Sequence, residues 1–162
     1  MEHMSLSSRV IQIQDLDEIL SFEQKRLAES TLDSSEAIFA TWSARWRKES
    51  LEHYLPLGWS FLIRDVDVKT PESPEGVLMG YILAQPFLFL EGQMQCLWVE
   101  HISYTALQAR DELCDLAYRI SREKHFQRVL FPNNSGVMNS IAGLKPEVWQ
   151  PTVISVKTTK AI

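Results

Sequence analysis

Cysteine is scarce in this chain, which has only Cys96 and Cys114 among its 162 residues. The two form no C-x-x-C pair and both lie in apolar patterns, so we predict buried free thiols in a reducing compartment, with a disulfide as the less favoured alternative. The four histidines have no metal-ligand spacing among themselves or with the cysteines. The sequence therefore predicts no metal site.

Long apolar runs are also missing. The most apolar stretch, residues 81–90, is interrupted by Gln85 and Pro86. It is far shorter than the roughly 20 residues that a membrane-spanning helix needs. Residues 1–5 have neither the basic nor the apolar region of a signal peptide. We therefore expect no membrane partner and a cytoplasmic protein.

Positive charge is in the minority, with 16 Lys and Arg against 21 Asp and Glu and a net charge of −5. This balance argues against a nucleic-acid partner, because phosphate binding needs a concentrated basic surface. It gives a slight preference for cationic partners. The chain has no G-x-G-x-x-G, P-loop or G-x-S-x-G motif, which excludes nucleotide sites and serine nucleophiles of those types.

The residues that are present describe a globular chain, with 45% hydrophobic and 23% charged residues and a length that suits one domain. Apolar spacing predicts strands near residues 10–13, 59–63, 77–90, 94–102 and 128–131, and a final strand or pair of strands over 148–156. It predicts helices near residues 16–27, 35–51, 106–125 and 135–143, and a hairpin turn at 91–93. The fold class is mixed α/β (α+β), with a mostly antiparallel central sheet of six to seven strands flanked by about four helices.

Three short features carry a resemblance: the run 80–84 (Gly-Tyr-Ile-Leu-Ala) on the third strand, Val99 on the fourth and Asn134 before the last helix. With the order β-α-α-β-β-β-α-β-α-β, the chain resembles the GNAT acyltransferases, whose usual acyl donor is acetyl-CoA. The resemblance implies one GNAT-like domain over residues 1–162 that moves an acetyl group to the amine of a small molecule or protein by direct attack. It also implies the donor-binding residues, which are Trp98, Val99, His101, Gln108, Ala109, Arg110 and Asn134.

The chain departs from that family in the loop that holds the pyrophosphate of coenzyme A. The family's Arg/Gln-x-x-Gly-x-Gly/Ala pattern falls on residues 104–109, where Tyr104 and Leu107 occupy the first slot and the first glycine slot. Ala109 suits the last slot. Thr105 with Gln108 predicts a capping box, which would satisfy the N–H groups that an anion needs. The tyrosine that protonates the leaving thiolate in the family is also missing, because its position falls on residue 140 or 141.

Glu100, at the end of the fourth strand, is the best candidate for the base that deprotonates the amine, and a solvent-facing role is the alternative. Strict alternation would place His101 on the opposite face, as an ordinary hydrogen-bonded histidine. Trp42 and Trp46 are candidate acceptor contacts, with a packing stripe on the second helix as the alternative.

Two functions follow from different classes. The first is an N-acetyltransferase that uses acetyl-CoA. The alternative is an inactive GNAT-like binding or dimerisation module that has lost the coenzyme A site, with the tryptophan-rich helix and the C-terminal edge strand available for a homodimer. An acyl-CoA site predicts a groove between the fourth and fifth strands. A binding module predicts that side chains, chiefly Tyr104 and Leu107, fill it.

Overall fold

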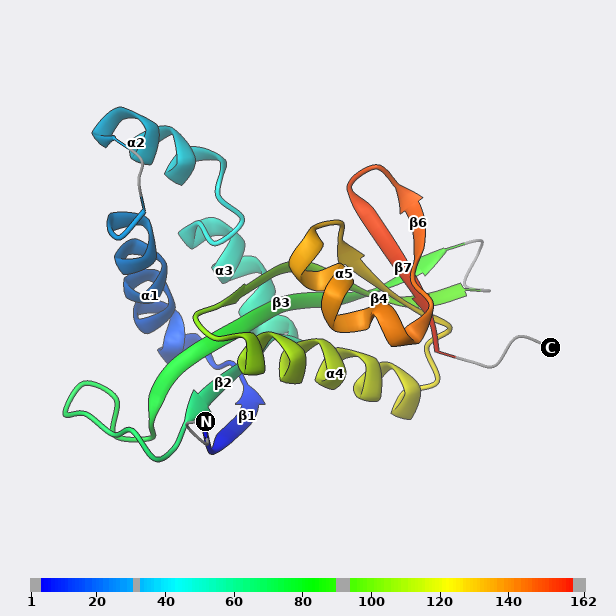
Figure 1. The fold of residues 1–162 in the computed structure, drawn as a ribbon, viewed down its shortest axis with the longest axis horizontal. Helices are drawn as coiled ribbons and strands as arrows, with labels where there is room; N and C mark the ends of the chain where they lie inside the picture. The colour runs from blue at the N-terminus through cyan, green and yellow to red at the C-terminus, as the bar shows by residue number, and fades with distance from the viewer. Residues whose placement is uncertain (1–3, 31–32, 90–93, 159–162) are drawn as a thin grey trace.

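A mixed sheet of seven strands forms the centre of the computed structural model, which describes residues 4–30, 33–89 and 94–158 (Figure 1). The strand order is β1-β2-β3-β4-β5-β7-β6, and all neighbours are antiparallel except β4 and β5. This arrangement confirms the predicted fold class. The strands are β1 (Leu6–Val10), β2 (Phe61–Asp65), β3 (Val77–Phe89), β4 (Met94–Tyr104), β5 (Arg128–Pro132), β6 (Glu147–Gln150) and β7 (Val153–Lys157).

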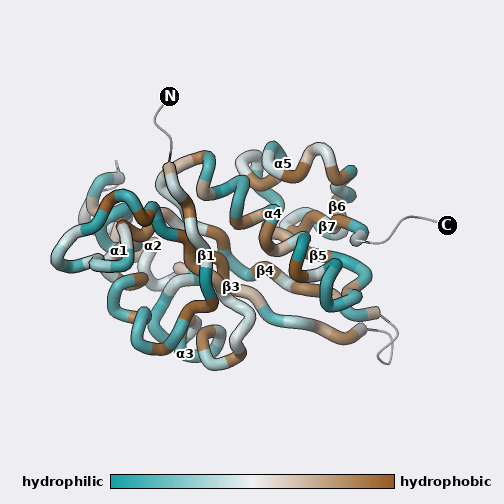
Figure 2. Tube along the Cα trace, turned by 90° about the horizontal axis from the view of Figure 1, so that it is seen from below, coloured by the Kyte–Doolittle hydropathy of each residue, from teal (hydrophilic) through white to brown (hydrophobic). Residues whose placement is uncertain are grey.

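Helices cover both faces of the sheet, and each face has its own apolar core (Figure 2). The helices are α1 (Leu16–Ala28), α2 (Ser34–Ser43), α3 (Lys48–Tyr54), α4 (Leu107–Glu123) and α5 (Ser135–Ile141). The first core joins α4 and α5 to the sheet through residues such as Leu113, Val99 and Val137. The second joins α1 and α3 to the other face through Ile19, Leu51 and Leu83.

The predicted second helix is in fact two helices. Ala44 has an extended backbone (φ −69°, ψ 139°), so α2 ends there and α3 begins at Lys48 after a turn. Trp46 lies in that turn and packs against the second core, whereas Trp42 on α2 is exposed. The break lets α3 turn onto the sheet, while α2 projects from the body of the molecule (Figure 1).

The N-terminal elements also differ from prediction. The first strand ends at Val10 rather than starting there, and Ile13 begins a 3-10 turn. Asp15 and Glu18 have the spacing of a capping box at the start of α1, but the Asp15 side chain makes no cap hydrogen bond there. Asp15 pairs with Arg9 at 2.7 Å and accepts the N–H of Gln12, and Glu18 binds the buried Arg64 at 2.6 Å. Charged partners from β1 and β2 therefore replace the local cap.

Other local predictions hold. Cys96 and Cys114 are buried free thiols, and burial raises the pKa of both, that of Cys114 to about 11. Pro86 lies in a stretch of β3 that pairs with β4 alone, as an edge position requires. The hairpin turn at 91–93 lies outside the described residues. In the described part of the chain, no helix has the length and apolarity to cross a membrane.

Candidate active site

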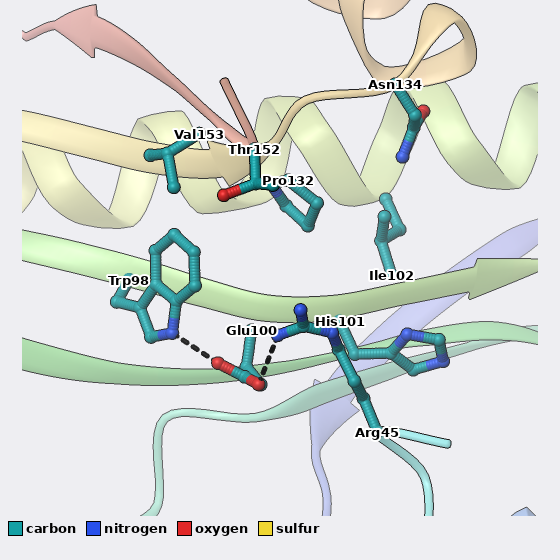
Figure 3. Close-up of a pocket in the computed structure, with 9 residues that line it drawn as sticks. All are labelled: Arg45, Trp98, Glu100, His101, Ile102, Pro132, Asn134, Thr152 and Val153. Atoms are coloured by element: carbon teal, nitrogen blue, oxygen red, sulfur yellow. Dashed lines mark hydrogen bonds and ion pairs between the residues drawn. The ribbon is translucent and has the colours of Figure 1, made fainter. Parts of the chain in front are cut away.

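A groove opens where β4 and β5 separate. Their parallel ladder runs from Cys96–Arg128 to Trp98–Leu130 and ends there, although β4 continues to Tyr104. A cavity of about 390 Å³ occupies the gap (Figure 3). Its walls come from β4, from the end of β5 and the segment after it, from the β6–β7 turn with the start of β7, and from the link after α2: Arg45, Trp98, Glu100, His101, Ile102, Pro132, Asn134, Thr152 and Val153.

A β-bulge on β4 shapes this groove. Leu83 of β3 pairs with His101 and Ala84 pairs with Val99, so Glu100 is an extra residue without a partner. The inserted residue breaks the alternation of side chains along the strand. Glu100 and His101 therefore line the same cavity, and the prediction that they face opposite sides is wrong.

The carboxylate of Glu100 has two partners in the groove (Figure 3). Oε1 accepts a hydrogen bond from the Arg45 guanidinium at 2.5 Å, and Oε2 accepts one from the Trp98 indole N–H at 2.5 Å. Tyr54 lies nearby, where burial and then the Glu100 carboxylate raise the pKa of its hydroxyl to about 12. The Glu100 side chain is thus placed in the groove with both oxygens engaged.

The start of α4 is free of the cap that the sequence predicts. Its N-cap is Ala106, which has no side-chain hydrogen bond to offer. Thr105 turns back to β3, where both its N–H and its hydroxyl donate to the Met79 carbonyl, at 2.9 and 3.3 Å. The capping box of Thr105 with Gln108 is therefore wrong. The first N–H groups of this 17-residue helix stay available to an anion.

Comparison of the sequence with known families and with curated proteins finds no match. The structure does match solved acetyltransferases over nearly its whole length. Arabidopsis thaliana NAA60, in complex with a bisubstrate analogue, has a TM-score of 0.64 at 13% identity and covers 94% of this chain and 95% of that one. A GNAT-family acetyltransferase from Listeria monocytogenes has a TM-score of 0.60 at 11% identity, with 94% of each chain covered. This chain has the GNAT fold.

A third GNAT-like neighbour is a chain of the NatC complex bound to Gag peptide and CoA, with a TM-score of 0.62 at 12% identity. The match covers 96% of this chain and all 100% of that one. Identities this low show the shared fold alone.

The fold brings some of the predicted residues together and separates others. Trp98, Glu100, His101 and Asn134 meet in the groove. Val99 and Ala109 are fully buried, with side chains in the first core. The remaining predicted residues lie outside the groove lining: Gln108 and Arg110 in the first turn of α4, Trp42 on α2, and Trp46 against the second core.

The residues expected to block the groove lie elsewhere. Leu107 is 63% exposed. Tyr104 packs against the first core, and its hydroxyl lies near Gly136 at the start of α5. The groove predicted for an acyl-CoA site is therefore open in this structure.

Sequence reasoning missed Arg45, Thr152 and Val153, which reach the groove from segments distant in the sequence. Arg45 carried one weak signal, its place between Trp42 and Trp46 in a helix expected to line the acceptor side. Nothing in the sequence marked the β6–β7 turn. The turn lies near β4 because of the order of the strands in the sheet, and no local motif reveals that order.

Proposed function

We propose that this chain transfers an acetyl group from acetyl-CoA to an amine. The observation that carries the proposal is the open groove between β4 and β5, which lies in a GNAT fold and has an uncapped helix start at the end of β4. Backbone groups of β4 that face the gap have no strand to pair with, so an extended ligand can satisfy them. Solved neighbours carry peptide and CoA, or a bisubstrate analogue, which supports an amine as the acceptor.

The donor would lie along β4, with backbone groups of Trp98, Val99 and His101 against the pantetheine arm and Asn134 on the opposite wall. Its pyrophosphate would lie at the start of α4, near Gln108, Ala109 and Arg110. The exposed side chain of Leu107 leaves the N–H groups of that turn accessible.

The charges around this turn predict a weak site for the pyrophosphate. The Arg110 guanidinium donates to the Asp111 carboxylate at 3.1 and 3.2 Å, so part of its charge is already balanced. Asp111 and Glu112 add negative charge beside the expected anion. Arg110 must therefore exchange Asp111 for phosphate when the donor binds.

The acceptor would approach from the Glu100 end of the groove, past Arg45. Glu100 is the base that the sequence predicts. Arg45 lies on the short segment between Trp42 and Trp46, the two predicted acceptor contacts. The transfer needs a free amine held in line with the thioester, so positioning and proton removal supply most of the rate.

The first experiment is a thermal shift and calorimetric titration with acetyl-CoA. We expect a rise in Tm that saturates with ligand concentration. Arg110→Glu should weaken binding about tenfold, because it places a negative charge beside the pyrophosphate. Arg119→Glu is the matched control, since it makes the same charge change farther along α4, where Arg119 pairs with Asp115. Its affinity should stay within about twofold of wild type.

The alternative, an inactive binding module, has one observation in its favour, which is the exposed apolar surface of α2. No thermal shift with millimolar acetyl-CoA would reject the acetyltransferase and favour the module. If acetyl-CoA binds, release of free CoA thiol with spermidine and with a short peptide that has a free N-terminus tests transfer to an amine.

A further inference from the structure

A cluster of polar side chains is buried on the α1 side of the sheet, next to the groove. Glu23 of α1 accepts a hydrogen bond from the Tyr81 hydroxyl at 2.7 Å. The Nε2 atom of His101 lies 3.7 Å from the same Glu23 oxygen, Oε1, and the His101 and Tyr81 ring centroids are 5.7 Å apart. The Glu23 side chain is only 7% exposed. A buried carboxylate behind an imidazole fixes the tautomer and the orientation of the ring.

The two nitrogens of His101 have different surroundings. Nε2 is enclosed by protein, has no hydrogen-bond partner among the described residues and faces Glu23. In Figure 3 the other ring nitrogen, Nδ1, lies on the edge of the ring nearer Ile102, a residue that also lines the groove. If Nε2 carries the proton, a small movement of the ring toward Glu23 would let this N–H donate a hydrogen bond to the carboxylate. Nδ1 would then keep its lone pair toward the groove.

Glu100, the neighbouring residue, is less available as a proton acceptor. Both side chains are 22% exposed, so access to the groove does not distinguish them. Both oxygens of Glu100, however, already accept hydrogen bonds, from Arg45 and Trp98. An amine would have to displace one of these donors before it could give Glu100 its proton.

We propose that Nδ1 of His101 takes the proton of the acceptor amine and that Glu23 and Tyr81 are positioning residues for this step. The inference rests on the acetyl transfer proposed above. The acceptor, an ammonium ion in solution, gives one proton to Nδ1. The neutral amine nitrogen then bonds to the thioester carbonyl carbon, the C–S bond breaks, and sulfur leaves with the electron pair. A second proton passes from nitrogen to the thiolate, and the imidazolium returns its proton to water.

The tautomer of His101 tests the geometry without any substrate. In protein labelled with ¹⁵N-histidine, NMR shifts at a pH where the ring is neutral distinguish Nε2–H from Nδ1–H, and His101→Gln assigns the signals. We expect the Nε2–H form in the wild type and a gain of the Nδ1–H form in Glu23→Gln. A merely structural role for Glu23 would leave the tautomer unchanged. A wild-type ring with its proton on Nδ1 would overturn the proposal, because that atom could then accept no proton.

Kinetics test the catalytic role of His101. The acceptor is spermidine or the short peptide, whichever releases more CoA thiol with the wild-type protein. His101→Gln should lower kcat/KM by about 10²- to 10⁴-fold while acetyl-CoA binding, measured by calorimetry, is retained. Glu100→Gln should cost less than His101→Gln. His53→Gln is the control, since His53 is exposed on α3 and contacts Gln85; its rate should match wild type.

The outcomes separate this inference from the proposed function. Wild-type protein that binds no acetyl-CoA rejects both. Wild-type protein that binds and transfers acetyl, while His101→Gln keeps more than a tenth of its rate or loses donor binding, rejects the histidine alone. A larger loss in Glu100→Gln would return the role to the carboxylate.

Discussion

At Gly80, β3 lies very close to β4 and α4. A Cβ at this position would lie 2.6 Å from the Ser103 carbonyl oxygen, 3.1 Å from the Tyr104 Cα and 3.2 Å from the Leu113 Cδ1. Two of these atoms belong to the backbone, which cannot rotate away. The close packing of β3 under the end of β4 therefore depends on the absence of a side chain here.

Gly80→Ala should destabilise the protein by about 1–3 kcal/mol, because the added methyl forces a shift of the β4 backbone. Gly143→Ala is the matched control, since a Cβ there meets nothing within 4 Å; it should change the free energy of unfolding by less than about 0.5 kcal/mol. Urea denaturation of both variants measures the difference. Equal midpoints would mean that β3 and β4 are packed less tightly in solution than in the structure.

Glu23 also makes stability depend on pH. Burial opposes its charge, but the neighbouring His101, Ser103 and Tyr81 side chains outweigh this effect and hold the pKa of Glu23 below its ordinary value of 4.5. A carboxyl with a lowered pKa in the folded state stabilises the fold above the pKa of the unfolded chain, and this contribution is lost as the pH falls through the folded value.

Between pH 5 and about pH 3, the Tm of the wild type should therefore fall more steeply than that of Glu23→Gln. Near pH 7 the variant should be the less stable of the two, because it lacks the charged partner of His101 and Tyr81. Thermal melts across that range check both statements. Parallel profiles would show that Glu23 titrates alike in the folded and unfolded chain.

At the scale of elements, helix caps show where sequence reasoning works and where it fails. Asn134 caps α5 as its place before the helix suggests, and its side-chain oxygen accepts the N–H of Val137 at 2.9 Å. Asp15 and Glu18 match a capping box equally well, but their carboxylates form ion pairs with arginines of β1 and β2 instead. A capping motif is local, and it cannot report a partner that lies far away in the sequence.

The same limit applies to the site. Apolar runs were enough to predict the long third and fourth strands and the helix after them, and the resemblance added Trp98, Glu100, His101 and Asn134, all four of which line the groove. The bulge at Glu100 was not predictable, because one extra residue leaves the apolar pattern of β4 almost unchanged. That single insertion decides which side of the strand His101 faces.

Substitutions at Asn134, which caps α5, and at Thr105, which does not cap α4, should have unequal effects. Asn134→Ala should cost about 1 kcal/mol, since it leaves an N–H of α5 without its acceptor. Thr105→Ala should cost less than about 0.5 kcal/mol, because its hydroxyl bonds the Met79 carbonyl weakly, at 3.3 Å, and caps no helix. Chemical denaturation distinguishes the two. A larger loss in Thr105→Ala would mean that the hydroxyl caps α4 in solution after all.

At the scale of the whole molecule, the groove follows from how the sheet is built. Antiparallel pairing holds β3 to β4 and β5 to β7, whereas the parallel ladder between β4 and β5 has only three residue pairs. The two halves of the sheet are joined at that ladder and separate beyond it. The first core, with α4 and α5, spans both halves on one face, so the opening stays in place without a lid.

The helix α2 has little support from this scaffold. None of its described side chains is buried, and Ile38, Phe39 and Trp42 are each more than half exposed. Phe39 and Trp42 contact each other edge to face, with ring centroids 5.2 Å apart. Helices held by little buried apolar surface open with low free energies.

Amides of residues 34–43 should therefore exchange with deuterium at least about tenfold faster than those of α4, whose inner face is fully buried in the first core. Hydrogen exchange read by mass spectrometry at low micromolar protein measures both helices in one experiment, so α4 serves as the internal reference. Equal protection of the two would contradict the exposed position of α2. Protection of α2 that rises with protein concentration would instead show that a second copy covers its apolar face, because only association depends on concentration.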